Sequence, residues 1–291
     1  MTPRRTSIVH GNCQAEAITV VLDKDPIVSS ILKIVYSRSY IHPVEGKWKQ
    51  RQRDVARCAV LYEQHDPEGF PKRAALPENC ITVQFPSLDL NVLWPFTCAN
   101  PYNRPEPPDF PFGRFPYGDR VIIAAIDQGM KAADIADYYL NGWDRFKVDL
   151  DRLLAIDTAR LNARDQHCQV RMAPYIVENF SKKRLFWTVD HPTTTVLEEL
   201  VEELLKASGR VDPHLADADI ASTLALYFGA RGPLGHTDVP IHPHIAEHFG
   251  LAWYDPQENV RLWDGNELSL EDYVIAMVNH AQAVKEERQP V

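Results

Sequence analysis

The N-terminal part of the chain, about residues 1–90, alternates short apolar runs with helix-like segments, and this alternation restricts the fold more than any other feature. Alanine and aliphatic residues recur at helical spacing after residue 13, up to a stop at Asp25-Pro26. Strand–helix–strand alternation favours a parallel sheet with right-handed crossovers, and short apolar strands fit burial on both faces. The sequence therefore predicts an α/β protein with a short parallel sheet. The predicted strands are residues 7–9, 31–36, 58–62 and 80–85.

A glycine turn, Gly11-Asn12-Cys13-Gln14, joins the first predicted strand to the first predicted helix. The first N–H groups of a helix have no partner within it and carry partial positive charge, so a cysteine placed there has its thiolate favoured. Ligands of parallel sheets bind at the carboxyl ends of the strands. We predict that Cys13 is catalytic and that the side-chain amides of Asn12 and Gln14 donate to a developing oxyanion. A buried structural thiol, with turn-making and capping roles for the amides, is the alternative.

A cysteine nucleophile needs a base, and two histidines follow predicted strands. His10 adjoins the cysteine motif, although it ends a strand and its ring can point away from the thiol. His191 follows the apolar run 185–189, which we predict to be a strand. If that strand neighbours the first one, their ends meet and His191 reaches Cys13, its ring oriented by Asp190 or by a backbone carbonyl. A helix-capping role is the alternative for His191.

The rest of the chain consists mostly of predicted helices and one aromatic loop. Residues 86–117 are rich in proline, which blocks helices and ladders, and in aromatic residues, which argue against disorder. This stretch is either a loop clamped onto the domain or a wall over a ligand site. We predict a single composite domain over residues 1–291, with a flavodoxin- or SGNH-like sheet and helices dominating overall. Its parts are an α/β core (about 1–90 plus 183–210), the loop 86–117, and a helical part (119–180 and 215–286).

The charge balance is acidic, with 31 Lys and Arg against 40 Asp and Glu, or −9 with neutral histidines. This balance argues against general nucleic-acid binding, which needs a basic surface. An anionic ligand would therefore need a local basic cluster, and one occurs at residues 47–57. We predict that its side chains bind phosphates, with a solvated basic face as the alternative. The predicted phosphate-binding residues are Lys47, Lys49, Arg51 and Arg53.

Disulfide, metal and membrane roles find little support in the sequence. The 5 cysteines are odd in number, irregularly spaced and without a C-x-x-C pair, which argues against a disulfide framework. His242, His244 and His248 lack the H-E-x-x-H spacing of a zinc site, so no metal is predicted, and a capping, packing or ligand-contact role is expected for His242. No apolar run of about 18 residues occurs, and the basic N-terminus lacks the apolar segment of a signal peptide. We expect a cytoplasmic chain with no transmembrane segment.

Several short motifs occur in order over most of the chain. They are His10-Gly11-Asn12-Cys13-Gln14, Phe85-Pro86-Ser87-Leu88, Leu93-Trp94-Pro95, Tyr117-Gly118-Asp119-Arg120, Asp190-His191-Pro192, Ile241-His242-Pro243 and His248-Phe249-Gly250-Leu251. Together they resemble the WcbI-type polysaccharide biosynthesis proteins. The resemblance implies an acetyltransferase of capsular polysaccharide pathways, with coenzyme A or acetyl-CoA as ligand and a sugar hydroxyl as acceptor. It also implies an active site that contains Cys13 and a histidine. We assign this histidine to His191, while His10 and His242 remain alternative candidates. For coenzyme A binding we assign Gly11, the basic cluster and His242.

Three functions are compatible with these residues. The leading hypothesis is acetyl transfer from acetyl-CoA to a sugar hydroxyl, either through a thioester on Cys13 or by direct attack with His191 as base. An SGNH-like or cysteine esterase that deacylates glycans would use the same turn with water as acceptor, and would not bind coenzyme A. A non-catalytic protein that holds coenzyme A or a glycan is the third. The expected partner is a small-molecule or glycan acceptor, and no oligomeric state is predicted.

Overall fold

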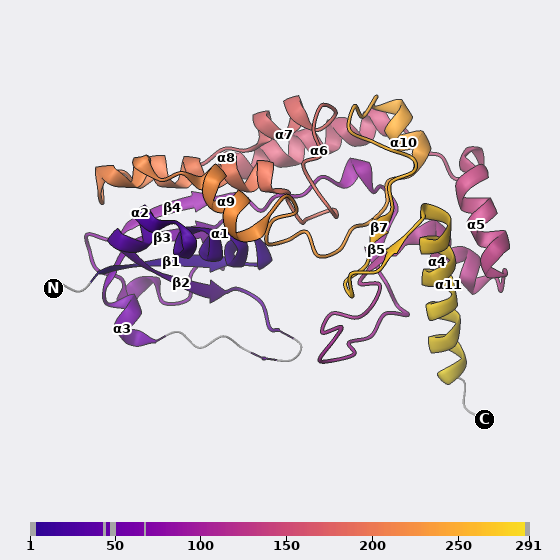
Figure 1. Cartoon of the computed structure of the whole chain (residues 1–291), viewed down its shortest axis with the longest axis horizontal. Helices are drawn as coiled ribbons and strands as arrows, with labels where there is room; N and C mark the ends of the chain where they lie inside the picture. The colour runs from indigo at the N-terminus through magenta and orange to yellow at the C-terminus, as the bar shows by residue number, and fades with distance from the viewer. Residues whose placement is uncertain (1–3, 43–44, 47–50, 67, 289–291) are drawn as a thin grey trace. The chain divides into compact units, whose positions relative to one another are not determined.

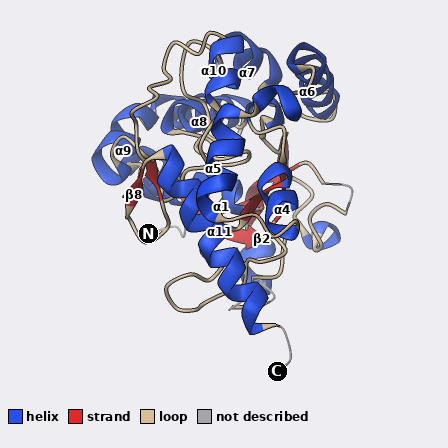
Figure 2. Cartoon of the chain, turned by 90° about the vertical axis from the view of Figure 1, so that its right-hand side faces the viewer, coloured by secondary structure: helices blue, strands red, loops and turns tan. Residues whose placement is uncertain are grey.

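The computed structural model describes residues 4–42, 45–46, 51–66 and 68–288. The described chain combines a parallel sheet with many helices, which confirms the predicted helix-rich α/β class (Figure 1, Figure 2). It divides into two compact units, each assembled from three segments. The first unit comprises Met1–Asp89, Thr158–Asn179 and Asp190–Gly235, and the second comprises Leu90–Asp157, Phe180–Val189 and His236–Val291. The single composite domain stays a prediction.

The first unit contains a parallel sheet of four strands in the order β2-β1-β3-β4. All four predicted strands are therefore confirmed, each with slightly different bounds. The central strand β1 pairs on both sides, and Gly11 at its carboxyl end lies opposite Arg38 of β2. The carboxyl ends of these strands therefore meet at one edge, where the Cys13 turn follows β1. The strands are β1 (Arg5–Gly11), β2 (Leu32–Arg38), β3 (Cys58–Gln64) and β4 (Ile81–Phe85).

The first helix begins and ends where the sequence predicts. In α1 (Cys13–Lys24), Asn12 is the N-cap, and its side chain accepts a hydrogen bond from Gln14 N at 2.9 Å. The helix stops at Asp25, which caps the short α2 (Pro26–Ile31), a helix that the sequence analysis did not predict. The proline after Asp25 fits the first turn of α2, where its missing N–H has no helical partner. The other helical elements of this unit are α3 (Gln52–Val55), η1 (Arg73–Ala75), α7 (Ala173–Asn179), α8 (Thr194–Ala207), η4 (Pro213–Asp217) and α9 (Ile220–Phe228), while α6 (Leu150–Asp165) has residues in both units.

The two faces of the sheet have different coverings. One face packs against α1, whose Ile18, Val21 and Leu22 are fully buried. The other face carries Ile8 in a small apolar cluster with Phe70 and residues of α3 and β3. Successive side chains of a strand point to opposite faces, so His10 lies on the Ile8 face and Gly11 on the α1 face.

The second unit is mostly helical. Its core joins α4 and α5 to the long C-terminal α11, with Ile126, Ile135 and Met277 among the buried residues. The helix α11 begins after Ser269, whose hydroxyl accepts from Asp272 N at 3.1 Å. The elements are η2 (Asn91–Leu93), β5 (Thr97–Ala99), β6 (Tyr117–Asp119), α4 (Arg120–Asp127), α5 (Ala132–Asn141), η3 (Trp143–Arg145), α10 (Pro243–His248), β7 (Val260–Arg261), β8 (Glu267–Leu268) and α11 (Leu270–Glu287).

The aromatic stretch 86–117 is ordered, and its aromatic side chains anchor it by packing into the protein interior. Trp94, Phe96, Tyr102, Phe110 and Phe115 are all buried. The predicted loop also contains strand residues, because β5 lies within the stretch and pairs antiparallel with β6, which begins at its last residue, Tyr117. Strands of three residues are too short to show a periodic pattern in the sequence.

The predicted strand 185–189 is wrong. These residues form no strand of the described sheets, although Leu185 and Phe186 are buried. Their backbone groups are satisfied by loops instead, since Val189 O accepts from Leu90 N at 2.9 Å and Trp187 O from Val239 N at 3.0 Å. Residues 183–189 also lie in the second unit and not with the sheet. An apolar run indicates burial, and burial alone does not make a strand.

No helix among the described residues is long and apolar enough to cross a membrane. No group of three or more His, Cys, Asp or Glu side chains in the same part of the chain is arranged to hold a metal ion. The 5 cysteines are free thiols.

Candidate active site

Cys13 is the first residue of α1 and follows the carboxyl end of β1, as the sequence predicts. The turn needs glycine at position 11, because a Cβ there would lie 2.7 Å from both Cβ and Oε1 of Gln64. That same Oε1 accepts from Asn12 N at 2.9 Å, and the Tyr36 hydroxyl donates to Asn12 O at 3.0 Å. The ends of three strands thus fix the backbone that presents Cys13.

The surroundings of the Cys13 thiol disfavour its thiolate form. Burial raises its pKa to about 12, the Asp190 carboxylate adds to the rise, and the N–H groups of Gln14 and Cys13 lower the pKa by less. The expected preference for the thiolate is therefore reversed by the surroundings of the thiol, while the catalytic role of Cys13 stays a prediction. The helix N-terminus has the expected effect, but the loss of hydration of a buried anion outweighs it.

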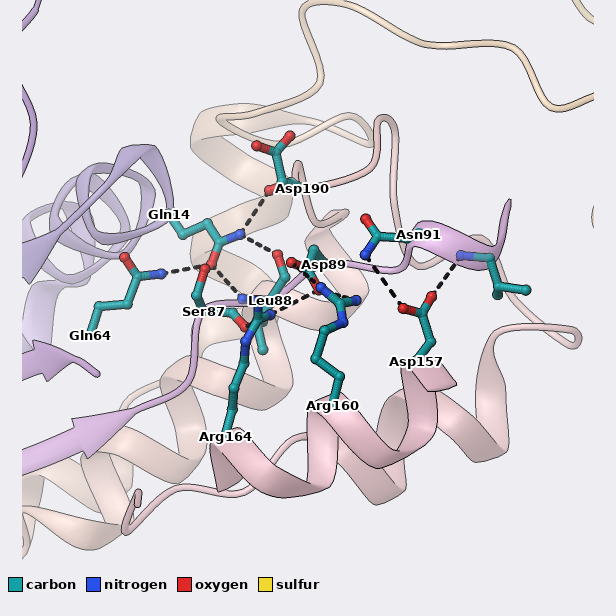
Figure 3. Close-up of polar contacts among 11 residues, drawn as sticks. Gln14, Gln64, Ser87, Leu88, Asp89, Asn91, Asp157, Arg160, Arg164 and Asp190 are labelled. Carbon is teal, nitrogen blue, oxygen red and sulfur yellow. Dashed lines mark hydrogen bonds and ion pairs between the residues drawn. The ribbon is translucent and has the colours of Figure 1, made fainter. Parts of the chain in front are cut away.

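Gln14 is completely buried, and its side-chain amide is saturated with hydrogen bonds (Figure 3). Nε2 donates to Leu88 O at 2.6 Å and to Asp190 O at 2.8 Å. Oε1 accepts from Leu88 N and from Gln64 Nε2, both at 3.0 Å. An amide offers two N–H donors and two lone pairs, so none remains for an oxyanion. The structure thus gives no support to the predicted oxyanion role of Gln14.

Whereas both N–H donors of the Gln14 side chain are occupied, the side-chain amide of Asn12 still has donors to offer. Its Oδ1 is used to cap α1, which also settles which side-chain atom is oxygen. Its Nδ2 makes no hydrogen bond with the residues that the structure describes, and the side chain is half-buried beside Cys13. Asn12 therefore remains the candidate side-chain donor at this turn.

His191 lies in the segment that Gln14 holds through Asp190 O. Burial lowers its pKa, while Asp190 and a hydrogen bond to the backbone of Leu234 work in the opposite direction. Burial thus favours the neutral form of this ring, which is the form that can act as a base. The Asp190 carboxylate influences both His191 and Cys13, so the segment lies near the Cys13 turn. The reach of His191 to Cys13 stays a prediction; what the structure shows is that the Gln14 amide bonds the neighbouring Asp190 carbonyl at 2.8 Å.

His10 is a structural residue on the Ile8 face of the sheet. Its Nδ1 lies 2.9 Å from both O and Oγ of Ser37, and its ring packs edge-on against Phe70 at 5.4 Å. Since α1 packs on the other face, the structure does not bring the His10 ring to Cys13.

His242 lies in the second unit and caps α10, the alternative already considered for it. Its Nδ1 accepts from His244 N at 3.2 Å, and its Nε2 lies 2.9 Å from Tyr139 O. Both ring nitrogens are used, and the ring packs against Trp143 and Phe146. The predicted contact with coenzyme A therefore finds no donor or acceptor on this ring.

The two described arginines among the predicted phosphate-binding residues do not lie at Cys13. Lys47 and Lys49 lie outside the described residues. Arg51 and Arg53 are exposed at α3, which precedes β3 and thus stands at the amino-terminal edge of the sheet (Figure 1). A strand rises about 3.3 Å per residue, so the length of β1 puts roughly 20 Å between this edge and Cys13.

A buried cation that the sequence analysis missed lies next to the Cys13 turn. Arg38 stands opposite Gly11, with its side chain 4% exposed. Its guanidinium lies 5.8 Å from the Tyr36 ring centre and 5.3 Å from that of Tyr40, and its Nη2 pairs with Glu45 at 2.9 Å. The predicted strand ended at residue 36, two residues short of this arginine. The two polar residues that extend β2 carry no local strand signal, so the place of Arg38 follows only from the register of β2 against β1.

Comparison of the sequence with models of known protein families identifies the family of this chain. The sequence model of the polysaccharide biosynthesis enzyme WcbI matches residues 6–213, which is more than half of the chain and includes Cys13, Arg38 and His191.

The chain belongs to the WcbI family of polysaccharide biosynthesis enzymes.

A solved WcbI structure has the same fold, with a TM-score of 0.73 and 16% sequence identity over 99% of this chain and 91% of that one. It is described as a novel polysaccharide biosynthesis enzyme, in its native form without a disulfide bond between coenzyme A and one of its cysteines. No curated protein matches this chain. His242 and the C-terminal helices of this WcbI family member lie beyond the matched residues.

Proposed function

We propose that the protein transfers an acetyl group from acetyl-CoA to a sugar hydroxyl during polysaccharide biosynthesis. The observation that carries this proposal is the junction of Cys13 with the Asp190–His191 segment at the carboxyl edge of the sheet, where α/β proteins bind ligands. Membership of the WcbI family supports a sugar acceptor. The description of the solved relative supports coenzyme A, because it links that ligand to a cysteine of that protein.

The residues around Cys13 fit a ligand with a thiol at one end and phosphates at the other. The thiol end would lie against Cys13, beside the half-buried Asn12. Arg38 would serve the phosphates in place of the predicted cluster, since guanidinium groups pair well with phosphate oxygens. Its present partner, Glu45, is 59% exposed and can be exchanged for a ligand anion.

The proposed chemistry is direct transfer with His191 as general base. Neutral His191 takes the proton of the acceptor hydroxyl while the hydroxyl oxygen bonds to the thioester carbonyl carbon. The carbon–sulfur bond breaks, its electron pair leaves on the coenzyme A sulfur, and His191 returns the proton to that sulfur. Asn12 Nδ2 and the first N–H groups of α1 would stabilise the oxyanion. A thiol of pKa about 12 is a poor nucleophile, which favours this route over a thioester on Cys13.

Calorimetry and thermal shift with coenzyme A and acetyl-CoA test the ligand. Because a ligand stabilises the state that binds it, saturation at 100 times the dissociation constant raises the free energy of unfolding by about 2.7 kcal/mol. We expect Arg38→Met to weaken binding strongly and the matched control Arg51→Met to leave it unchanged. The absence of any shift at millimolar ligand would contradict the proposal, and turnover of acyl sugars without coenzyme A binding would favour the esterase.

A further inference from the structure

The saturated amide of Gln14 has a more specific role than filling the core. It makes a pair of hydrogen bonds to the backbone of Leu88, in which Oε1 accepts from Leu88 N and Nε2 donates to Leu88 O. Two bonds to one residue fix the plane of the amide. Gln64 Nε2 occupies the remaining lone pair of Oε1, so the second N–H of Nε2 has one fixed direction. That direction leads to the Asp190 carbonyl at 2.8 Å.

The backbone around Leu88 is anchored independently of Gln14 (Figure 3). Arg164 donates to Ser87 O at 3.0 Å and pairs with Asp89 Oδ1 at 2.9 Å. Arg160 pairs with the same carboxylate, with distances of 2.6 and 2.8 Å to its two oxygens. Residues 87–89 therefore serve as a fixed support for the Gln14 amide.

The segment after Asp190 is short and stiff. Only His191, Pro192 and Thr193 separate Asp190 from the start of α8, and Thr193 O accepts the N–H groups of the first helical turn. Proline fixes its own φ and restricts the residue before it, which is His191. A hydrogen bond at Asp190 O and a helix at residue 194 thus hold this segment at both ends.

We propose that Gln14 is a positioning residue, which holds Asp190 and His191 beside Cys13 through its hydrogen bond to the Asp190 carbonyl. The effect of Gln14 on the reaction rate rests on the acyl transfer proposed above, whereas its effect on the position of His191 does not. Gln14 acts on the reaction through His191 and touches no substrate.

The test compares Gln14→Met, which keeps the length of the side chain and removes all four hydrogen bonds, with Arg160→Met. The control variant loses one anchor of residues 87–89 but leaves the bond to Asp190 in place. Both variants lower the melting temperature, because each leaves buried polar groups unpaired. Stability therefore does not separate positioning from a purely structural role.

The separating measurement is the titration of His191, followed by NMR of ring-labelled histidine and assigned with His191→Gln. In Gln14→Met we expect the released segment to admit water, so that the pKa of His191 rises toward its ordinary value of 6.5. In Arg160→Met we expect no change. The kcat of acetyl transfer by Gln14→Met should fall about 100-fold, because a displacement of about 1 Å of a reacting group can lower the rate by this factor. The affinity for coenzyme A should stay the same.

An unchanged His191 titration in folded Gln14→Met would overturn the proposal. If the methionine variant does not fold, Gln14→Asn replaces it, because the shorter amide cannot reach both Leu88 and Asp190. The same criterion then applies. Failure of the proposed function would show differently, as absent coenzyme A binding in the unmodified protein together with a shifted His191 in the variant.

Discussion

His191 and His242 occupy matching sequence settings and have different surroundings. Each precedes a proline near the start of a helix, α8 or α10, and burial lowers the pKa of both. His242 uses both ring nitrogens, one on the cap of α10 and one on Tyr139 O. His191 stands next to an acidic residue that also acts on Cys13. The two share a His-Pro pair before a helix, while their neighbours in space determine what each ring can do.

The largest expected effect separates the two histidines by activity. His191→Gln should lower acetyl transfer about 10²- to 10⁴-fold, the usual contribution of a general base. His242→Gln should leave the activity of the folded enzyme unchanged. The measurement is acetyl transfer from acetyl-CoA to a panel of sugar acceptors, followed by mass spectrometry. Full activity of His191→Gln would remove the distinction between the two histidines.

The second prediction concerns whether His191 removes a proton from the acceptor hydroxyl or from the Cys13 thiol. In direct transfer the proton comes from the acceptor hydroxyl, so Cys13→Ala should reduce activity less than His191→Gln does. Intact-mass measurement after mixing with acetyl-CoA should show no acetyl group on the protein. An adduct that appears in the unmodified protein and disappears in Cys13→Ala would instead establish a thioester on Cys13.

The third prediction tests the structural role of His242. His242→Ala removes the cap of α10, which should lower the free energy of unfolding by about 1–2 kcal/mol. Coenzyme A affinity should stay the same. His248→Ala is a suitable control, because the exposed pair of His248 with Asp151 is worth little in water. Urea denaturation measures both changes, and equal stability of the two variants would contradict the capping role.

The smallest expected effect is on the pH dependence of stability. The pKa values of His191 and His242 are lower in the folded protein than the ordinary value of 6.5, so below that pH the unfolded chain binds protons that the folded one does not. The free energy of unfolding should therefore fall as the pH drops below about 6.5 and level off above it. Replacing both histidines with glutamine should flatten part of this slope, while His10 and His280, whose pKa values are also lowered, still contribute to it. Urea denaturation between about pH 5 and pH 8 measures it, and an unchanged slope would contradict the assignment.

The parts of the fold that could be predicted are those with a local signal. The strands of the sheet, the stop of α1 at Asp25 and the cap of α11 at Ser269 follow from periodicity and capping chemistry. Residues 185–189 show the limit, because an apolar run records burial and their backbone partners come from distant loops. Short strands such as β5 and β6 leave no periodic trace.

The candidate site divides in the same way. Cys13 at a helix start could be predicted from four adjacent residues, since the turn is local. Arg38 and the hydrogen bonds of Gln14 could not, because they depend on the register of β2 and on backbone groups far along the chain. The raised pKa of Cys13 also escaped prediction, since it depends on how much water the folded chain excludes.

The sequence by itself determined where Cys13 stands: an apolar strand, a glycine and an asparagine cap place it at the start of a helix. The tertiary structure decided what accompanies it. A buried amide selects its partners by distance and direction, and Gln14 joins segments that are 74 and 176 residues away. Such contacts exist only once the chain has folded, so Gln14 changes from a predicted oxyanion donor into the residue that holds His191 in place.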